Sequence, residues 1–174
     1  MSTLYPAIAI ANWLIEKNQS DNCGLTHLKI QKLLYFAQGF HLANLSNPLF
    51  EDDIEAWKYG PVVNAVYHAL KRYDDDEIFN FIQGHYLSEG NLCFGKPKVE
   101  LNDELTHKFL NIFWGNYSKI EPWKLVEMSH LSNGPWEQIS QAIINKKTFS
   151  QVIPKELMKK YFIQFINKSS DNDR

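Results

Sequence analysis

Apolar residues at helical spacing are the feature of this sequence that most restricts its fold. Starting at position 30, the positions i, i+3, i+4, i+7, i+10 and i+11 would share one face of a helix, and five of the six are apolar: Ile30, Leu33, Leu34, Ala37, Phe40 and His41. Thr26 stands just before this run, where its hydroxyl is suited to accept a hydrogen bond from an N–H of the first turn. We therefore expect a helix that follows Thr26 and buries this stripe.

The same spacing predicts further helices over 6–17, 62–73, 121–130, 135–146 and 154–167, and one that Asp103 caps. Signals for strands are few: a short strand over 54–58, and a hairpin of 86–87 and 92–94 around the turn at 88–91, extended by Val99 and Leu101. This pattern predicts a mainly α fold (α+β), a compact single-domain helical bundle with a small antiparallel β element.

Length and composition limit the class of protein. A chain of 174 residues has room for one domain with a hydrophobic core, which we place at 1–166, followed by a polar tail at 167–174 that we expect to be disordered. Cys23 and Cys93 lack a CxxC spacing, the start lacks the features of a signal peptide, and no apolar run is long enough for a membrane helix. We expect two reduced thiols and a cytoplasmic protein.

Sequence motifs of catalysis and metal binding are absent. The six histidines form no HExxH, no Cys/His cluster has zinc spacing, and there is no P-loop, GxSxG or GxGxxG after a strand. We expect no metal, no cofactor and no enzymatic activity. The alternative is an enzyme whose site is assembled from distant residues, in which His130 and Glu127, three positions apart on a helix, would supply acid–base groups.

Two turns combine aromatic residues with a Gly-Pro pair. In AWKYGPVV, at 56–63, Trp57 and Tyr59 precede the pair, and in SHLSNGPW, at 129–136, Trp136 follows it. Glycine permits backbone angles that other residues avoid, and proline sets the first turn of a helix. Two interpretations stay open: the rings clamp the turns against the core, or they form an aromatic groove for a partner.

The order of these segments resembles a known family. LKIQKLLYFAQG at 28–39, PLF at 48–50, IEAWKYGPVV at 54–63, VY at 66–67 and the turn at 129–136 are similar to the Panacea domain, the SocA-like antitoxin family, which includes phage-associated proteins of the GepA type. The resemblance spans about 28–140. It implies an antitoxin that neutralises a cognate protein toxin, encoded beside it, by direct contact. One branch of the family acts differently and delivers its toxin to a protease.

These segments supply the candidates for partner binding. On the first predicted helix, Lys32, Tyr35 and Gly39 form one stripe, with Gln31 and Gln38 beside it. This stripe is either a solvated surface or a contact for a toxin, where Gly39 would let a partner backbone approach closely. The full set is Lys29, Gln31, Lys32, Tyr35, Gln38, Gly39, Trp57, Tyr59, Gly60, Pro61, Val62, Tyr67, His130, Pro135 and Trp136.

Charge is distributed unevenly along the chain. Residues 1–145 hold 11 Lys and Arg against 17 Asp and Glu, whereas 146–174 hold 7 against 3, so an acidic body precedes a basic end and the net charge is −2. The lysines of this end, at 146, 147, 155, 159, 160 and 168, favour a second alternative, a nucleic-acid-binding regulator of its own operon. The simpler interpretation is the solvated face of an amphipathic helix.

Overall fold

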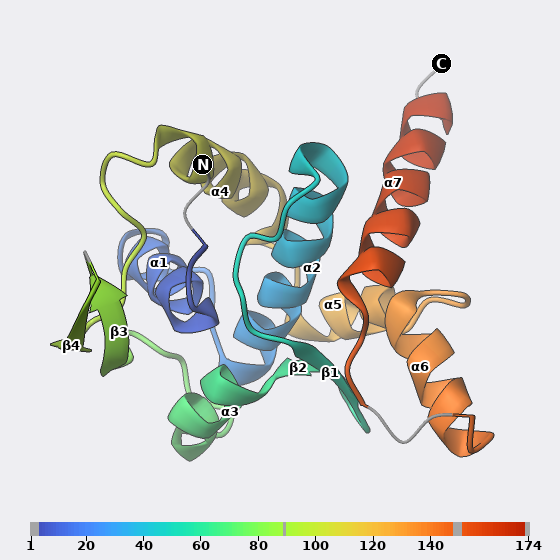
Figure 1. Cartoon of the computed structure of the whole chain (residues 1–174), viewed down its shortest axis with the longest axis horizontal. Coiled ribbons are helices and arrows are strands. Elements are labelled where there is room, and N and C mark those ends of the chain that lie inside the picture. Colours follow the sequence, from blue (N-terminus) through green and yellow to red (C-terminus); the bar gives the residue numbers. More distant parts are fainter. Residues whose placement is uncertain (1–3, 89, 148–150, 173–174) are drawn as a thin grey trace.

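The computed structural model describes residues 4–88, 90–147 and 151–172. These form seven α-helices and two antiparallel hairpins, which confirms the mainly α prediction (Figure 1). In chain order the elements are α1 (Ala7–Asp21), α2 (His27–Leu45), β1 (Ile54–Trp57), β2 (Gly60–Val63), α3 (Asn64–Leu70), a 3-10 turn (Lys71–Tyr73), β3 (Gly84–Ser88), β4 (Asn91–Gly95), α4 (Glu104–Tyr117), α5 (Pro122–Ser129), α6 (Pro135–Ile144) and α7 (Lys155–Asn172).

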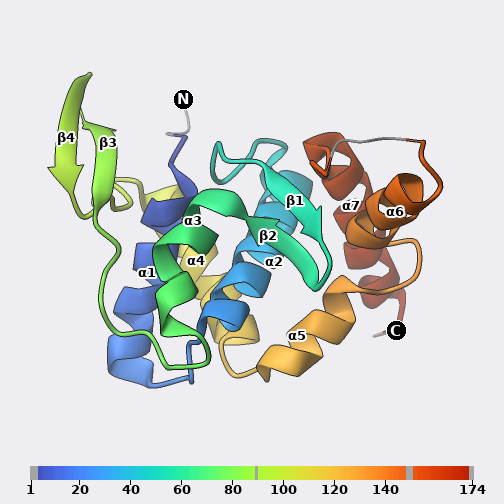
Figure 2. The same ribbon diagram turned by 90° about the horizontal axis from the view of Figure 1, so that it is seen from below.

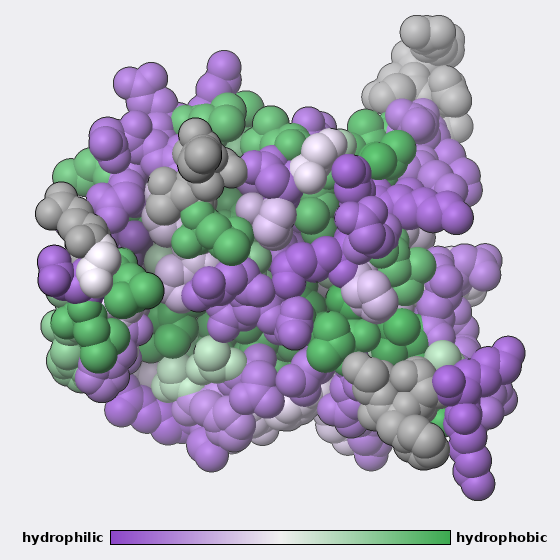
Figure 3. Space-filling model, viewed as in Figure 1, coloured by the Kyte–Doolittle hydropathy of each residue, from purple (hydrophilic) through white to green (hydrophobic). Residues whose placement is uncertain are grey.

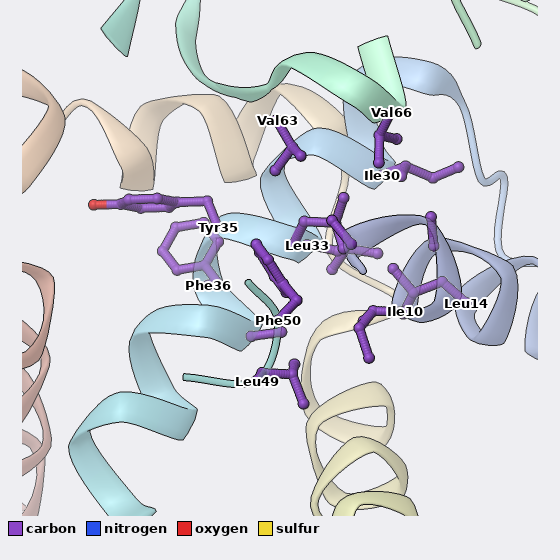
Figure 4. Packing of buried hydrophobic residues seen from close by; sticks show 14 of the residues in the cluster. Ile10, Leu14, Ile30, Leu33, Tyr35, Phe36, Leu49, Phe50, Val63 and Val66 are labelled. Atoms are coloured by element: carbon purple, nitrogen blue, oxygen red, sulfur yellow. The ribbon is translucent and has the colours of Figure 1, made fainter. Parts of the chain in front are cut away.

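Helix α2 is the centre of the fold. It contacts α1, α3, α4, α5, α7 and β2, and Figure 2 shows it between α1 and α3 on one side and the last three helices on the other. The predicted cap is confirmed, because the Thr26 side chain accepts a hydrogen bond from the N–H of Lys29 at 3.3 Å. Figure 4 shows the apolar stripe of α2 meeting side chains of α1 and of the segment after α2, among them Leu14 and Phe50.

The β1–β2 hairpin corrects one predicted helix. Val62 and Val63, expected in a helix over 62–73, pair with Glu55 and Ile54 in the hairpin, and α3 begins only at Asn64. β-branched side chains suit a strand, and the ladder to β1 supplies hydrogen bonds that a helix start would leave unmade. The helix also ends earlier than predicted, at Leu70, and a 3-10 turn follows.

The second hairpin is confirmed, but its extension is wrong. β3 and β4 pair around the predicted turn, with Leu87 opposite Leu92. Val99 is instead buried in the core outside any strand, and Leu101 is exposed. Asn12 of α1 explains the difference: its amide nitrogen donates to the carbonyls of Ile82 and Pro97, at 3.0 and 2.9 Å, and so anchors the segments on both sides of the hairpin to α1.

The C-terminal part of the chain returns to the first hairpin. Before α7, the N–H of Ile153 donates to the carbonyl of Ile54 at 2.8 Å, and the N–H of Ala56 donates to the carbonyl of Gln151 at 2.7 Å. α7 then runs to Asn172, so the polar tail predicted from position 167 is helical as far as 172; residues 173–174 lie outside the described residues. No glycine or proline stands in 167–172 to end the helix, and local composition alone did not reveal its length.

The surface mixes polar and apolar residues. On the face seen in Figure 3, apolar residues lie in several patches separated by polar ones. Among the described residues, no helix is both long enough and apolar enough to cross a lipid bilayer.

Two helical glycines provide a test of the α2–α7 contact. A Cβ at Gly39 would overlap the Phe162 ring of α7, whereas a Cβ at Gly115 of α4 would meet nothing within 4 Å. Gly39→Ala should therefore lower the free energy of unfolding by about 1–3 kcal/mol through overpacking, although Ala normally favours a helix. Gly115→Ala should raise it by about 0.5–1 kcal/mol. Urea unfolding of both variants checks the two signs; a Gly39→Ala protein as stable as wild type contradicts the close packing.

Candidate functional site

The two Gly-Pro turns meet in space. The indole N–H of Trp136 donates to the carbonyl of Trp57 at 2.9 Å, across 79 residues of sequence. The ring of His130 lies edge-on to Trp136, with 3.8 Å between ring centroids. A Cβ at Gly60 would lie 3.3 Å from Cε1 of His130. The turns at 56–63 and 129–136 therefore form one structural unit, which we call the corner site.

Lys32 lies beneath the corner site. Its side chain is 1% exposed, and its Nζ donates to the carbonyls of Tyr59 and Pro61, each at 3.1 Å. Gly60, between these two residues, has φ +113°, and a Cβ there would lie 2.5 Å from Nζ of Lys32. The backbone angle therefore favours glycine, and a side chain here would also displace the Lys32 amine. The amine of α2 thus holds the hairpin turn in place.

Burial of the amine changes its protonation. Desolvation lowers the pKa of Lys32 to about 7. In the described part of the chain Lys32 forms no ion pair, and its two carbonyl acceptors match the two N–H donors of a neutral amine. Burial, together with the nearby charge of Lys32, also lowers the pKa of His27, five residues earlier on α2.

The two glutamines of α2 bind backbone rather than solvent. Gln31 accepts from the N–H of Val63 at 2.8 Å and donates to its carbonyl at 3.4 Å. Gln38 accepts from the N–H of Leu49 at 2.7 Å and donates to the carbonyl of Phe50 at 2.9 Å. Each amide thus satisfies polar backbone groups that would otherwise be buried without partners.

The polar stripe of α2 is therefore neither a solvated nor a partner-facing surface, which corrects both interpretations. Tyr35 is 2% exposed, and burial raises its pKa. Lys29 is also buried, donates to the carbonyl of Cys23 at 2.6 Å, and has its pKa lowered by burial. The close approach expected at Gly39 is made by Phe162 of the same chain. Spacing along one helix does not reveal which other segments cover it.

A row of half-buried rings extends from the corner site to α3. The indole N–H of Trp57 donates to Glu55 at 2.7 Å, and its ring lies 4.8 Å from that of Tyr67. Tyr67 in turn lies 5.2 Å from His27. Tyr59 is different, because 72% of it is exposed, with Nζ of Lys58 5.0 Å above its ring.

The fifteen candidates, all described, fall into three groups. Ten are buried: Lys29, Gln31, Lys32, Tyr35, Gln38, Gly39, Gly60, Pro61, Val62 and Pro135. Four are half-buried: Trp57, Tyr67, His130 and Trp136. Tyr59 alone is exposed. The structure thus brings most of the candidates together as a scaffold and leaves one ring, that of Tyr59, mostly exposed.

The acid–base pair considered from sequence does not form. The carboxylate of Glu127 pairs with Lys124 at 2.9 Å, and both side chains are well exposed. Nδ1 of His130 lies 2.6 Å from the carbonyl of Val126, so this nitrogen holds the proton and donates it. Across residues 4–88, 90–147 and 151–172, no group of His, Cys, Asp and Glu side chains is placed to hold a metal ion.

Sequence reasoning missed an apolar groove between α2, α4, α5 and α7. Its volume is about 640 Å³. On α4 the rings of Phe109, Phe113 and Tyr117 line it as a ladder, with centroids 6.3 and 4.8 Å apart and planes within 12° of parallel. The spacing of four residues between these aromatics was the available signal.

Comparison with known proteins agrees with the resemblance noted from the sequence. The family model described as "Antitoxin SocA-like, Panacea domain" matches residues 30–137. Antitoxin SocA of Caulobacter vibrioides (strain NA1000 / CB15N) is 33% identical over 130 residues, which cover 74% of this chain and 67% of that protein. The matched region of the family model includes both turns of the corner site and almost all of α2, whereas α1 and α7 lie outside it.

Proposed function

The chain belongs to the SocA-like antitoxin family defined by the Panacea domain, and from this premise we propose that it is an antitoxin that neutralises a protein toxin by binding it directly. The family match across the corner site carries the proposal. We also propose that the chain is a binding protein and not an enzyme, acts in the cytoplasm, and has its toxin encoded beside it.

The hydrogen bonds of the corner site support binding over catalysis. Lys32, Gln31 and His130 each bond to backbone carbonyls within the fold, so their polar groups serve structure. What this scaffold presents outward is Tyr59, whose backbone Lys32 holds. A tyrosine on a fixed backbone loses little freedom on binding, which suits an interface anchor.

Co-expression with the product of the neighbouring gene tests the proposal. We expect that product alone to stop growth, this chain to restore it, and the two proteins to co-purify. A toxic neighbour that this chain neither neutralises nor binds would contradict the proposal. In cells without ATP-dependent proteases, rescue should persist at an unchanged toxin level; loss of rescue there would instead indicate delivery to a protease. Binding of operator DNA that weakens steeply with salt would indicate the regulator.

Tyr59→Ala is expected to weaken toxin binding at least tenfold, because an exposed anchor ring is removed. The stability of the free chain should change by less than about 0.5 kcal/mol, since the ring packs on little of the fold. Phe94→Ala is the matched control: its ring is 69% exposed on β4, away from the corner site. Calorimetric titration with the toxin checks both. Equal losses in the two variants would show that Tyr59 is not an anchor.

A further inference from the structure

The apolar groove is built like half of a helical interface. Figure 1 shows the C-terminal half of α2 between α4 and α7, and the groove follows this part of the molecule. Besides the α4 ladder, Phe40 of α2 and Phe165 of α7 line it. Ile112 stands at its edge on α4 and is 59% exposed. Two asparagines, Asn44 and Asn116, add polar groups to this mainly apolar lining. Aromatic and aliphatic side chains gathered in a concave site with a few polar groups are typical of binding surfaces.

The shape of the groove selects a helix as its occupant. Its wall on α4 runs from Phe109 to Tyr117, about 12 Å at 1.5 Å per residue. This length matches about two turns of a second helix. Because the walls of the groove are themselves helices, the rows of side chains on an added helix would pack between the rows of side chains on the walls. The added helix would contact the groove through its side chains at positions i, i+3 or i+4, and i+7.

Other occupants fit less well. The residues of this sequence outside the described ranges lie in stretches of three or fewer, too short for a groove of this length. A second copy joined by two-fold symmetry would place the same concave surface against itself, and two hollows do not fill each other. A protruding helix of a separate protein fits the shape of the groove.

A positive charge beside the groove indicates which residues should flank the apolar stripe of the partner helix. Lys108 lies one turn before Ile112, on the same side of α4. It is exposed and forms no ion pair within the residues that the structure describes. An acidic residue beside the apolar stripe of the partner would therefore meet an unpaired lysine.

We propose that this groove binds an amphipathic helix of the toxin, with an apolar stripe on the ring ladder of α4 and an acidic residue opposite Lys108. This inference rests on the proposed function, because it requires a toxin that the chain binds. It concerns a surface separate from the corner site, so the two contacts are tested by different variants.

Ile112→Glu and Ile144→Glu form a matched pair. Both isoleucines are exposed on helices, at 59% and 69%, but Ile144 ends α6 outside the groove. With the product of the neighbouring gene as probe, we expect Ile112→Glu to weaken binding at least tenfold and Ile144→Glu to change it less than twofold. Circular dichroism and urea unfolding should show both variants folded. Equal binding by the two variants overturns the groove assignment and leaves the proposed function standing.

Photo-crosslinking identifies the occupant. A benzophenone amino acid at position 112 should link to a toxin segment that reads as an amphipathic helix with an acidic flank, and the same group at position 144 should not. A link to a second copy of this chain, or to an extended toxin segment, would overturn the inference. If the wild-type chain binds no toxin at all, this result contradicts the proposed function, and the groove assignment, which depends on it, is rejected as well.

Discussion

The free energy of unfolding is expected to rise as the pH increases from about 7 toward 9.5, by up to about 3 kcal/mol. The cause is Lys32. In the folded chain burial lowers its pKa to about 7, whereas in the unfolded chain the amine has its ordinary pKa of 10.5. Between these values the unfolded chain holds a proton that the folded chain has released, so raising the pH favours folding. Below pH 7 both states are protonated and the cost of burying the charge is fully present.

Lys32→Met isolates this effect. Methionine has a similar shape and does not titrate, so the variant should lose most of the rise between pH 7 and 9.5. The lowered pKa of Lys29 acts in the same direction in both proteins and cancels in the comparison. Measurements should stop near pH 9.5, since burial raises the pKa of Tyr117 to about 12 and its phenol opposes folding at higher pH. Urea unfolding at four pH values is sufficient; parallel profiles for the two proteins would mean that Lys32 titrates like a solvated lysine.

Trp136→Ala is expected to lower the free energy of unfolding by about 3–5 kcal/mol. The indole joins the two turns of the corner site through its hydrogen bond to Trp57 and its contact with His130, and the smaller side chain leaves a cavity between them. Trp136→Phe keeps a ring but leaves the carbonyl of Trp57 without this donor, and should cost about 1–3 kcal/mol.

Trp123→Ala is the control of the same chemical change. Its side chain is 72% exposed on α5, so the loss should stay below about 0.5 kcal/mol. Urea unfolding of all three variants gives the comparison. If Trp136→Ala were as mild as Trp123→Ala, the two turns would be held together by other contacts, and the clamp interpretation of Trp136 would be wrong.

Local signals predicted most of the helices and the sites of their caps. The apolar period beginning at Ile30 located α2, and Thr26 and Asp103 cap α2 and α4 as expected. These predictions hold because a cap and a periodic face depend on residues within one or two turns. The same reasoning wrongly predicted Val62 in a helix, because the local pattern does not show that Val62 pairs with strand β1.

The sequence predicted which residues make up the candidate site, but not which of their side chains are buried and which are exposed. The two turns around Gly60 and Trp136 were selected from sequence, and the structure joins them. Lys32 was expected on a surface and is buried, because the carbonyls that bind it belong to a turn 27 residues and more away. Polarity alone does not distinguish a solvated lysine from one whose hydrogen bonds lie inside the fold.

Taken by itself, the sequence determined that the fold is mainly helical and that the Gly-Pro turns and α2 carry a family pattern. These features depend on short spacings, capping residues and backbone angles. Each of these is set by residues close together in the sequence. Only the tertiary structure decided which faces are covered, that Lys32 is a buried amine, that Tyr59 is the exposed ring of the corner site, and that α2, α4, α5 and α7 leave an apolar groove. Burial depends on contacts between distant segments, and no local pattern records which segments meet.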